Sequence, residues 1–196
     1  LQGIPDIAEK IIIERDLTLL EDLNCRYHVS QISSSKSVDV IAQKKEVVNF
    51  TTGVSINNLS LNENDIGDFR TFLKLSPPLR TEDDRVSLIK GINKNLIDVI
   101  VSDHKPEDEE SKRLTFSQAA TGASGIETLL PLSLELFHNG SVKLFKLIEL
   151  LTSNPAKILK INKGNLSIGN DADFCIVDIY KPWIVKKENI VSKSKN

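Results

Sequence analysis

Apolar and polar positions along this chain follow two periods, one typical of helices and one typical of strands. Ile7, Ile11, Leu17 and Leu20 recur at helical spacing, which predicts a helix from residue 5 to about residue 23 with a buried stripe. Shorter segments rich in strand-forming residues either alternate in polarity or are continuously apolar. These segments predict three strands, within residues 25–32, 47–54 and 97–101.

Helical patterns separate and follow these strands. Because strand and helix alternate through about residue 140, we predict parallel βα units and an α/β fold class. Three such units do not close a (β/α)₈ barrel, which needs about 250 residues, so the segment corresponds to the C-terminal part of such a barrel. The predicted helices cover about 33–44, 81–95, 125–138, 142–151 and 154–159, and residues 62–65 resemble a further helix start.

The pattern changes near residue 160. Gly164, Gly169 and the alternating run 172–177 predict short antiparallel strands. We therefore predict two parts, residues 1–160 with the last βα units of an incomplete barrel and residues 161–196 with a small β structure.

Composition narrows the classes of partner. The 196 residues carry a net charge of −2, which does not favour nucleic acid or an anionic membrane surface. No apolar run is long enough to span a bilayer. Cys25 and Cys175 lie far apart and show no metal-binding spacing, so we expect a reducing, cytoplasmic protein. The chain starts with Leu1 and contains no methionine, so we expect it to be a piece of something longer.

One acidic residue stands where α/β active sites lie. Asp103 follows the buried strand 97–101 and begins the long polar stretch 102–114. A carboxylate there can bind a metal or act as a general base. It can equally be a loop aspartate that accepts backbone hydrogen bonds, and the sequence leaves both interpretations open. His104 is better explained as a structural residue.

Three other polar places have structural alternatives. Strand alternation puts His28 and Gln31 on opposite faces, and His28 is better explained as a packing residue than as a ligand. Asn57 and Asn58 offer neutral amides, which are poor metal ligands but can hydrogen-bond a substrate or each other. Arg80 could clamp a carboxylate or brace the acidic helix start that follows it.

Four segments together resemble dihydroorotases, and in particular the multifunctional complex type, within the amidohydrolase superfamily. These segments are Pro77–Arg85, Val101–Pro106, Gly125–Pro131 and Gly164–Asp173. The resemblance implies a metal-dependent TIM-like hydrolase barrel, followed by part of a small β-sandwich over residues 161–196. It also implies zinc as cofactor, dihydroorotate or carbamoyl aspartate as ligand, and association with aspartate transcarbamoylase.

The resemblance assigns roles to individual positions. Asp103 matches the aspartate that binds metal and shuttles a proton, and Thr121 with Gly122 matches a backbone contact to substrate. Other metal-binding and substrate-binding positions differ from the family. Gln31 stands where the family has a metal-binding histidine, and Ser76 and Glu107 replace a substrate-binding asparagine and histidine. Asn57–Asn58 matches a double histidine of the family.

These substitutions weaken the expectation of zinc and leave two hypotheses. In the first, the protein is a non-catalytic homologue that scaffolds aspartate transcarbamoylase. In the second, the full-length protein is an active zinc-dependent cyclic amidohydrolase, whereas these 196 residues alone are inactive. Glu107 would repel an anionic ligand unless a cation neutralises it, and the nearby candidates are Lys105, Lys112 and Arg113.

Overall fold

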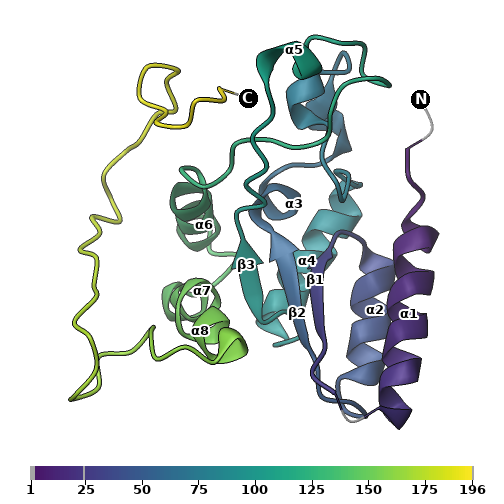
Figure 1. Ribbon diagram of the computed structural model, residues 1–196, viewed down its shortest axis with the longest axis vertical. Helices are drawn as coiled ribbons and strands as arrows, with labels where there is room; N and C mark the ends of the chain where they lie inside the picture. The colour runs from purple at the N-terminus through teal and green to yellow at the C-terminus, as the bar shows by residue number, and fades with distance from the viewer. Residues whose placement is uncertain (1–2, 24, 196) are drawn as a thin grey trace.

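A computed structural model describes residues 3–23 and 25–195. Its centre is a parallel sheet in the order β1-β2-β3, with β1 at His28–Ile32, β2 at Thr51–Ser55 and β3 at Val99–Val101. The three predicted strands are therefore confirmed, and each is shorter than the segment that predicted it. Figure 1 shows α1 and α2 beside β1, and α6, α7 and α8 grouped beside β3.

The helices follow the predicted order. The helix α1 precedes β1, α2 lies between β1 and β2, and α4 precedes β3, while a short α3 continues directly from β2. The helix start predicted at residues 62–65 is a short 3₁₀ helix, η1, and a second 3₁₀ helix, η2, follows it. The bounds are α1 Asp6–Asp22, α2 Ser35–Lys44, α3 Ile56–Ser60, η1 Glu63–Ile66, η2 Thr71–Leu73, α4 Glu82–Asn93, α5 Glu109–Lys112, α6 Leu129–His138, α7 Leu144–Leu151 and α8 Ser153–Leu159.

The core lies between the sheet and its helices. Val54 of β2 and Ile32 of β1 are fully buried, as are Ile41 of α2 and Leu88 of α4. Gly53 allows β1 and β2 to pack closely, because a Cβ there would lie 2.3 Å from the backbone oxygen of Ser30. Any larger residue would push the two strands apart.

The stripe predicted for α1 is only half correct. Leu17 and Leu20 are buried as predicted, but Ile7 and Ile11 are 42% and 55% exposed. The helix packs against α2 along one face, which also carries Ile13. Its remaining apolar residues have no neighbouring element among the described residues, so helical periodicity overestimated the buried face.

Two carboxylates from other helices hold the start of α2. Glu9 of α1 accepts hydrogen bonds from the backbone nitrogens of Ser33 and Ser34, at 2.9 and 3.2 Å. Asp84 of α4 accepts from the nitrogen and hydroxyl of Ser35, at 2.7 and 2.8 Å. Helix N-termini leave backbone donors unsatisfied, so these acceptors both satisfy the donors and fix α1 and α4 against α2.

The strands predicted beyond residue 160 are not formed. No strand is present over residues 160–195, and the run 172–177 is extended, exposed backbone. Figure 1 shows this segment leaving the body of the molecule as a long arm. An extended segment becomes a stable strand only when a neighbouring strand pairs with it, and none does so here. The division into residues 1–160 and 161–196, with a β-sandwich in the second part, stays a prediction.

Candidate functional site

Asp103 and Gln31 meet at the C-terminal edge of the sheet. Asp103 comes two residues after β3, and Gln31 lies in β1 on the far side of β2. The Gln31 side-chain nitrogen donates a hydrogen bond to Oδ1 of Asp103 at 3.1 Å. His28, three residues earlier in β1, bonds instead to Thr51 at 2.7 Å. The prediction that His28 and Gln31 face different sites is therefore confirmed.

The Asp103 carboxylate points toward the site rather than into its own loop. Within the described residues it accepts a hydrogen bond from Gln31 and none from a backbone N–H. Burial raises the pKa of Asp103 above its ordinary value, and the Gln31 hydrogen bond and the Lys105 charge only partly oppose this shift. The residue has a positive φ of 49°, a conformation that is uncommon outside glycine. Of the two interpretations left open by the sequence, the contacts favour a site-facing carboxylate.

His104 has the structural role that the sequence favoured. Its Nδ1 accepts hydrogen bonds from the backbone nitrogens of Gly125 and Ile126, at 3.1 and 3.3 Å. Because Nδ1 is the acceptor in both bonds, a neutral ring carries its proton on Nε2. His104 thus ties the segment after β3 to the segment that leads into α6.

The predicted substrate wall is partly assembled around Lys105. Its ammonium nitrogen lies 3.6 Å from Oε1 of Glu107 and 3.3 Å from the hydroxyl of Thr121. Gly122 adopts a φ of 138°, and a Cβ there would lie 2.5 Å from the Lys105 carbonyl oxygen. Of the three cations that the sequence offered, Lys105 pairs with Glu107 directly, and Lys112 also lies close enough to interact with its charge.

Ser76 is not part of this assembly. It is exposed, it precedes a cis peptide bond to Pro77, and its hydroxyl has no hydrogen-bond partner among residues 3–23 and 25–195. The structure therefore brings Glu107, Thr121 and Gly122 together around Lys105 and leaves Ser76 apart.

Lys112 and Lys74 hold the segment 115–122, a role that the sequence assigned to neither of them. The Lys112 side chain is buried, and its ammonium donates to the carbonyl oxygens of Thr71 and Ala120, at 3.0 and 2.9 Å. Burial lowers its pKa. Lys74 donates to the carbonyl of Ala119 at 2.7 Å. The only sequence signal was their position beside a polar loop, and surface lysines share it.

Asn57 and Asn58 bring buried amides to the start of α3. The Asn58 nitrogen donates to the Pro78 carbonyl at 3.0 Å. Within the described chain, the Asn57 nitrogen and the Asn58 oxygen are buried without a hydrogen-bond partner. Such unsatisfied polar atoms are costly and uncommon in folded proteins. These residues are thus kept at a free-energy cost.

The donor set of this chain does not fit a zinc site. Protein zinc is held by three or four thiolate, imidazole or carboxylate ligands. Across the described residues, no group of three or more His, Cys, Asp or Glu side chains could hold a metal ion. Asp103 supplies one carboxylate, and its neighbour Gln31 supplies a neutral amide whose N–H already points at that carboxylate. The amide nitrogen therefore cannot ligate a cation, and the amide oxygen is a poor zinc ligand compared with imidazole.

Arg80 braces the fold and takes no part in the Asp103 site. Its Nε donates to the Ser33 hydroxyl at 3.0 Å, and its guanidinium lies 3.9 Å from Glu9. The sequence suggested that Arg80 clamps a carboxylate or braces the acidic helix start that follows it. Its guanidinium faces the carboxylate of Glu9 in α1 and not that helix start. Glu9 itself was missed, because nothing in α1 marks one glutamate as the acceptor for a distant run of serines.

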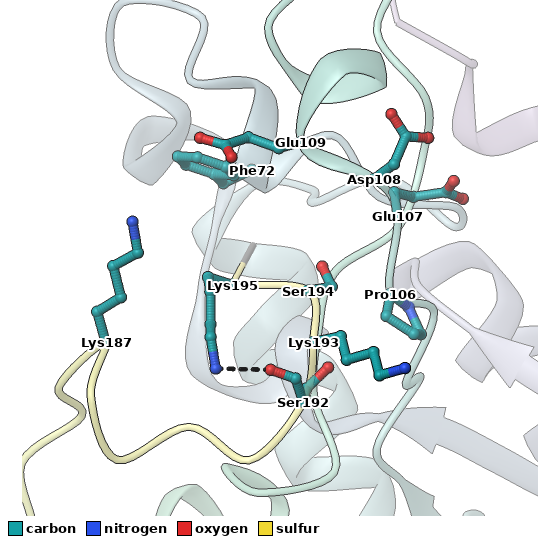
Figure 2. A pocket seen from close by; sticks show the side chains of 10 residues that line it. All are labelled: Phe72, Pro106, Glu107, Asp108, Glu109, Lys187, Ser192, Lys193, Ser194 and Lys195. Carbon is teal, nitrogen blue, oxygen red and sulfur yellow. Dashed lines mark hydrogen bonds between the residues drawn. The ribbon is translucent and has the colours of Figure 1, made fainter.

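One cavity is lined by residues that follow Asp103 in the chain but does not include Asp103 itself. It has a volume of about 920 Å³ and lies between the segment 106–109 and the chain end 192–195. Figure 2 shows carboxylates of Glu107, Asp108 and Glu109 on one side, with lysines of the chain end opposite them. The end segment is anchored by Glu127, which accepts from the Val191 and Ser192 nitrogens at 3.0 and 3.1 Å.

Comparison with known proteins gives the family. Residues 2–196 match the model of the amidohydrolase family. The chain belongs to this family. Two relatives named dihydroorotase match the whole chain, one from Ehrlichia canis (strain Jake) at 41% identity and one from Bacillus subtilis (strain 168) at 39%. The chain spans 44% and 46% of these relatives, which is just under half of their length.

Solved amidohydrolase structures bear out the fold class. The L-hydantoinase (dihydropyrimidinase) from Arthrobacter aurescens superposes with a TM-score of 0.82 at 30% identity, over 86% of this chain and 39% of that one. The dihydropyrimidinase from Brevibacillus agri NCHU1002 gives 0.80 at 24% identity over the same shares of the two chains, and at that identity only the fold is shared. The prediction of an α/β amidohydrolase barrel segment is confirmed. No helix in the described part of the chain is long and apolar enough to cross a membrane.

Proposed function

We propose that this chain is the C-terminal barrel portion of a dihydroorotase-like protein of pyrimidine biosynthesis that does not hydrolyse dihydroorotate. One observation carries the proposal, namely the hydrogen bond of 3.1 Å from the Gln31 amide to Asp103. Gln31 stands where the resemblance implies a histidine ligand. A neutral imidazole presents a lone pair to a metal, whereas this amide presents a proton to the neighbouring carboxylate.

The altered substrate wall supports the same conclusion. Dihydroorotate is an anion, and Glu107 places a carboxylate where the resemblance implies a histidine. Lys105 lies 3.6 Å from Glu107 and offsets its charge, so the pair is close to neutral. An ion pair that is satisfied internally gives an anionic ligand less attraction than a lone cation would give. Ser76, exposed and apart, offers a shorter arm than the asparagine it replaces.

The second part of the proposal is a binding role. The resemblance implies association with aspartate transcarbamoylase, and such an association needs the fold but not the hydrolytic site. The helices α1, α2 and α4 pack together and share the satisfied carboxylates Glu9 and Asp84. A scaffolding homologue needs a stable framework and does not need a working site. The satisfied carboxylates and the unsatisfied amides fit these two conditions. Co-purification with aspartate transcarbamoylase from the native source tests this part.

One observation favours an active hydrolase at full length. Asp103 remains in place after β3, and burial raises its pKa, which makes its carboxylate a better proton acceptor. In that case, Asp103 would take the proton of the attacking water and deliver it to the ring nitrogen that leaves. The same carboxylate would then be essential for turnover.

A hydrolysis assay separates the two. The protein at its native length is incubated with dihydroorotate, and with carbamoyl aspartate for the reverse direction, beside its Asp103→Asn variant. We expect no turnover above the variant in either direction. Turnover that Asp103→Asn abolishes would overturn the proposal and establish the alternative. An authentic dihydroorotase, assayed in parallel, verifies the conditions.

A further inference from the structure

A second hollow lies at the opposite end of the sheet from Asp103. It is formed by the N-terminal ends of β1 and β2, where His28 and Thr51 begin the strands, and by the end of α8. Its volume is about 680 Å³. Its lining includes Arg26, His28, Asn49, Thr51, Lys157 and Lys160.

The charge in this hollow has one sign. Arg26, Lys157 and Lys160 are cationic, and no aspartate or glutamate is among the lining residues. This concentration of positive charge occurs in a chain whose net charge is −2. A concave surface lined by one sign of charge focuses the electric field and attracts ions of the opposite sign.

The two lysines of this hollow differ from several ion-paired lysines of the molecule. Lys36 pairs with Asp6 at 2.9 Å, Lys45 pairs with Asp98 at 2.6 Å, and Lys44 pairs with Glu21. In contrast, the ammonium groups of Lys157 and Lys160 have no partner within the described residues. They are therefore available to an external anion.

The remaining groups add hydrogen-bond capacity. Arg26 uses one nitrogen to donate to the Ile158 carbonyl, and this bond holds its guanidinium at the rim. His28 and Thr51 are joined at 2.7 Å, and the side-chain amide of Asn49 has no partner among the residues that the structure describes. Asp98 lies near His28, but its carboxylate is already bonded to Lys45 and to the Thr52 nitrogen, at 2.6 and 2.8 Å.

We propose that this hollow binds a phosphorylated small molecule. Phosphate oxygens match guanidinium, ammonium and amide donors, and the volume lies within the roughly 300–1,000 Å³ typical of small-molecule sites. The site is separate from Asp103 and does not depend on the function proposed above. A ligand there would join the sheet to the end of α8 through Arg26 and Lys160.

The first test measures binding of inorganic pyrophosphate by calorimetry at low salt. We expect one saturable site, and an affinity at least about tenfold lower in the double variant Arg26→Ala/Lys160→Ala, because two charge-assisted contacts are lost. The double variant Lys90→Ala/Lys94→Ala removes the same charge from an exposed surface beside α4 and should bind normally. The proposal fails if the native protein shows no saturable binding, or if both double variants weaken it equally.

The second test needs no substitution. Cys25 lines the hollow and Cys175 lies on the exposed arm, and both are free thiols. We compare alkylation by anionic iodoacetate with alkylation by neutral iodoacetamide, site by site, using mass spectrometry. The ratio of the two rates cancels the thiolate fraction and reports the local potential. A higher ratio at Cys25, with pyrophosphate protecting Cys25 alone, is expected, and equal ratios without protection would refute the site.

Discussion

The carboxylates at the start of α2 and the polar groups at the edge of the sheet differ in how fully they are hydrogen-bonded. Glu9 and Asp84 are surrounded by serine and backbone donors, and each oxygen has a partner. Asp103 has one neutral amide as partner, and the Asn57 and Asn58 amides keep buried atoms without any in the described chain. The first region stabilises the fold, whereas the second retains polar groups at a cost in free energy.

This difference shows that the fold and the chemistry, which the resemblance implies together, need not be kept together. Family membership describes the scaffold, and the scaffold of this chain is well satisfied. The chemistry depends on a few side chains at the strand ends, where this chain has the amides Gln31, Asn57 and Asn58 at positions to which the resemblance assigns histidines. A chain can therefore keep the amidohydrolase fold while its site becomes unsuited to metal.

The largest effect should come from Glu9. The substitution Glu9→Gln leaves five donors of Ser33, Ser34 and Ser37 facing an amide, and it removes the charge beside Arg80. We expect the free energy of unfolding to fall by about 3 kcal/mol, measured by urea denaturation. The matched change Glu14→Gln, on the exposed side of α1, should have little effect. A similar loss for both would mean that the cap contributes nothing specific.

A smaller loss, with a characteristic pH dependence, is expected at Asp84. Burial acts to raise the pKa of Asp84, but hydrogen bonds from Ser35 and Thr81 outweigh it, and the pKa lies below its ordinary value. We expect Asp84→Asn to cost about 2 kcal/mol at neutral pH. Because the folded-state pKa is depressed, this stabilisation is complete above the unfolded-state pKa of about 3.9. It is lost as the pH falls through the folded-state value.

Unfolding measured from pH 6 downward checks the sign of this prediction. The gap between the native protein and Asp84→Asn should stay constant down to about pH 5 and shrink below about pH 4. A gap that widens toward low pH would contradict the assignment of Asp84 as an ionised cap.

Removal of an unsatisfied amide should cost little. Asn57→Leu deletes a buried nitrogen that has no partner in the described chain, so we expect a change below about 1 kcal/mol in the free energy of unfolding. Asn58→Leu also breaks the bond to the Pro78 carbonyl and should cost more. If Asn57→Leu proves the more damaging of the two, then Asn57 has a partner that the account lacks.

The smallest effect concerns one pKa. Burial raises the pKa of Asp103, and the Gln31 hydrogen bond acts to lower it. Gln31→Leu should therefore raise the pKa of Asp103 further while leaving stability nearly unchanged. A titration of the Asp103 carboxyl carbon by NMR measures the shift. A lower pKa in the variant would show that Gln31 does not donate to the carboxylate.

Much of the fold followed from local patterns. The continuous apolar run before Asp103 and the alternation around Gln31 predicted β3 and β1, because strands buried in a sheet have distinctive sequences. The stripe on α1 was overestimated at Ile7 and Ile11, since periodicity cannot tell which apolar face has a neighbour. The antiparallel strands near 172–177 failed for a related reason, because pairing depends on a partner that local sequence does not specify.

The site was predictable by position but not by contact. Asp103 was found from its place after a buried strand, and the resemblance singled out Gln31. That the two side chains bond to each other depends on the sheet order, which places β1 and β3 on either side of β2. The sequence offered three cations near Glu107, and the distance of 3.6 Å from Lys105 depends on the loop geometry, which the sequence does not give. Glu9 binds serines more than twenty residues away, and no local sequence signal marked it for this role.

A zinc titration of the protein at its native length tests the central claim most directly, namely that an amide–carboxylate pair has replaced the metal site. The side-chain amide signals of Gln31 and the carboxyl signal of Asp103 are followed by NMR while zinc is added to stoichiometry. The account predicts that these signals do not move and that elemental analysis of the desalted protein finds no stoichiometric zinc. A saturable shift of both residues with one or two zinc ions retained per chain would contradict it.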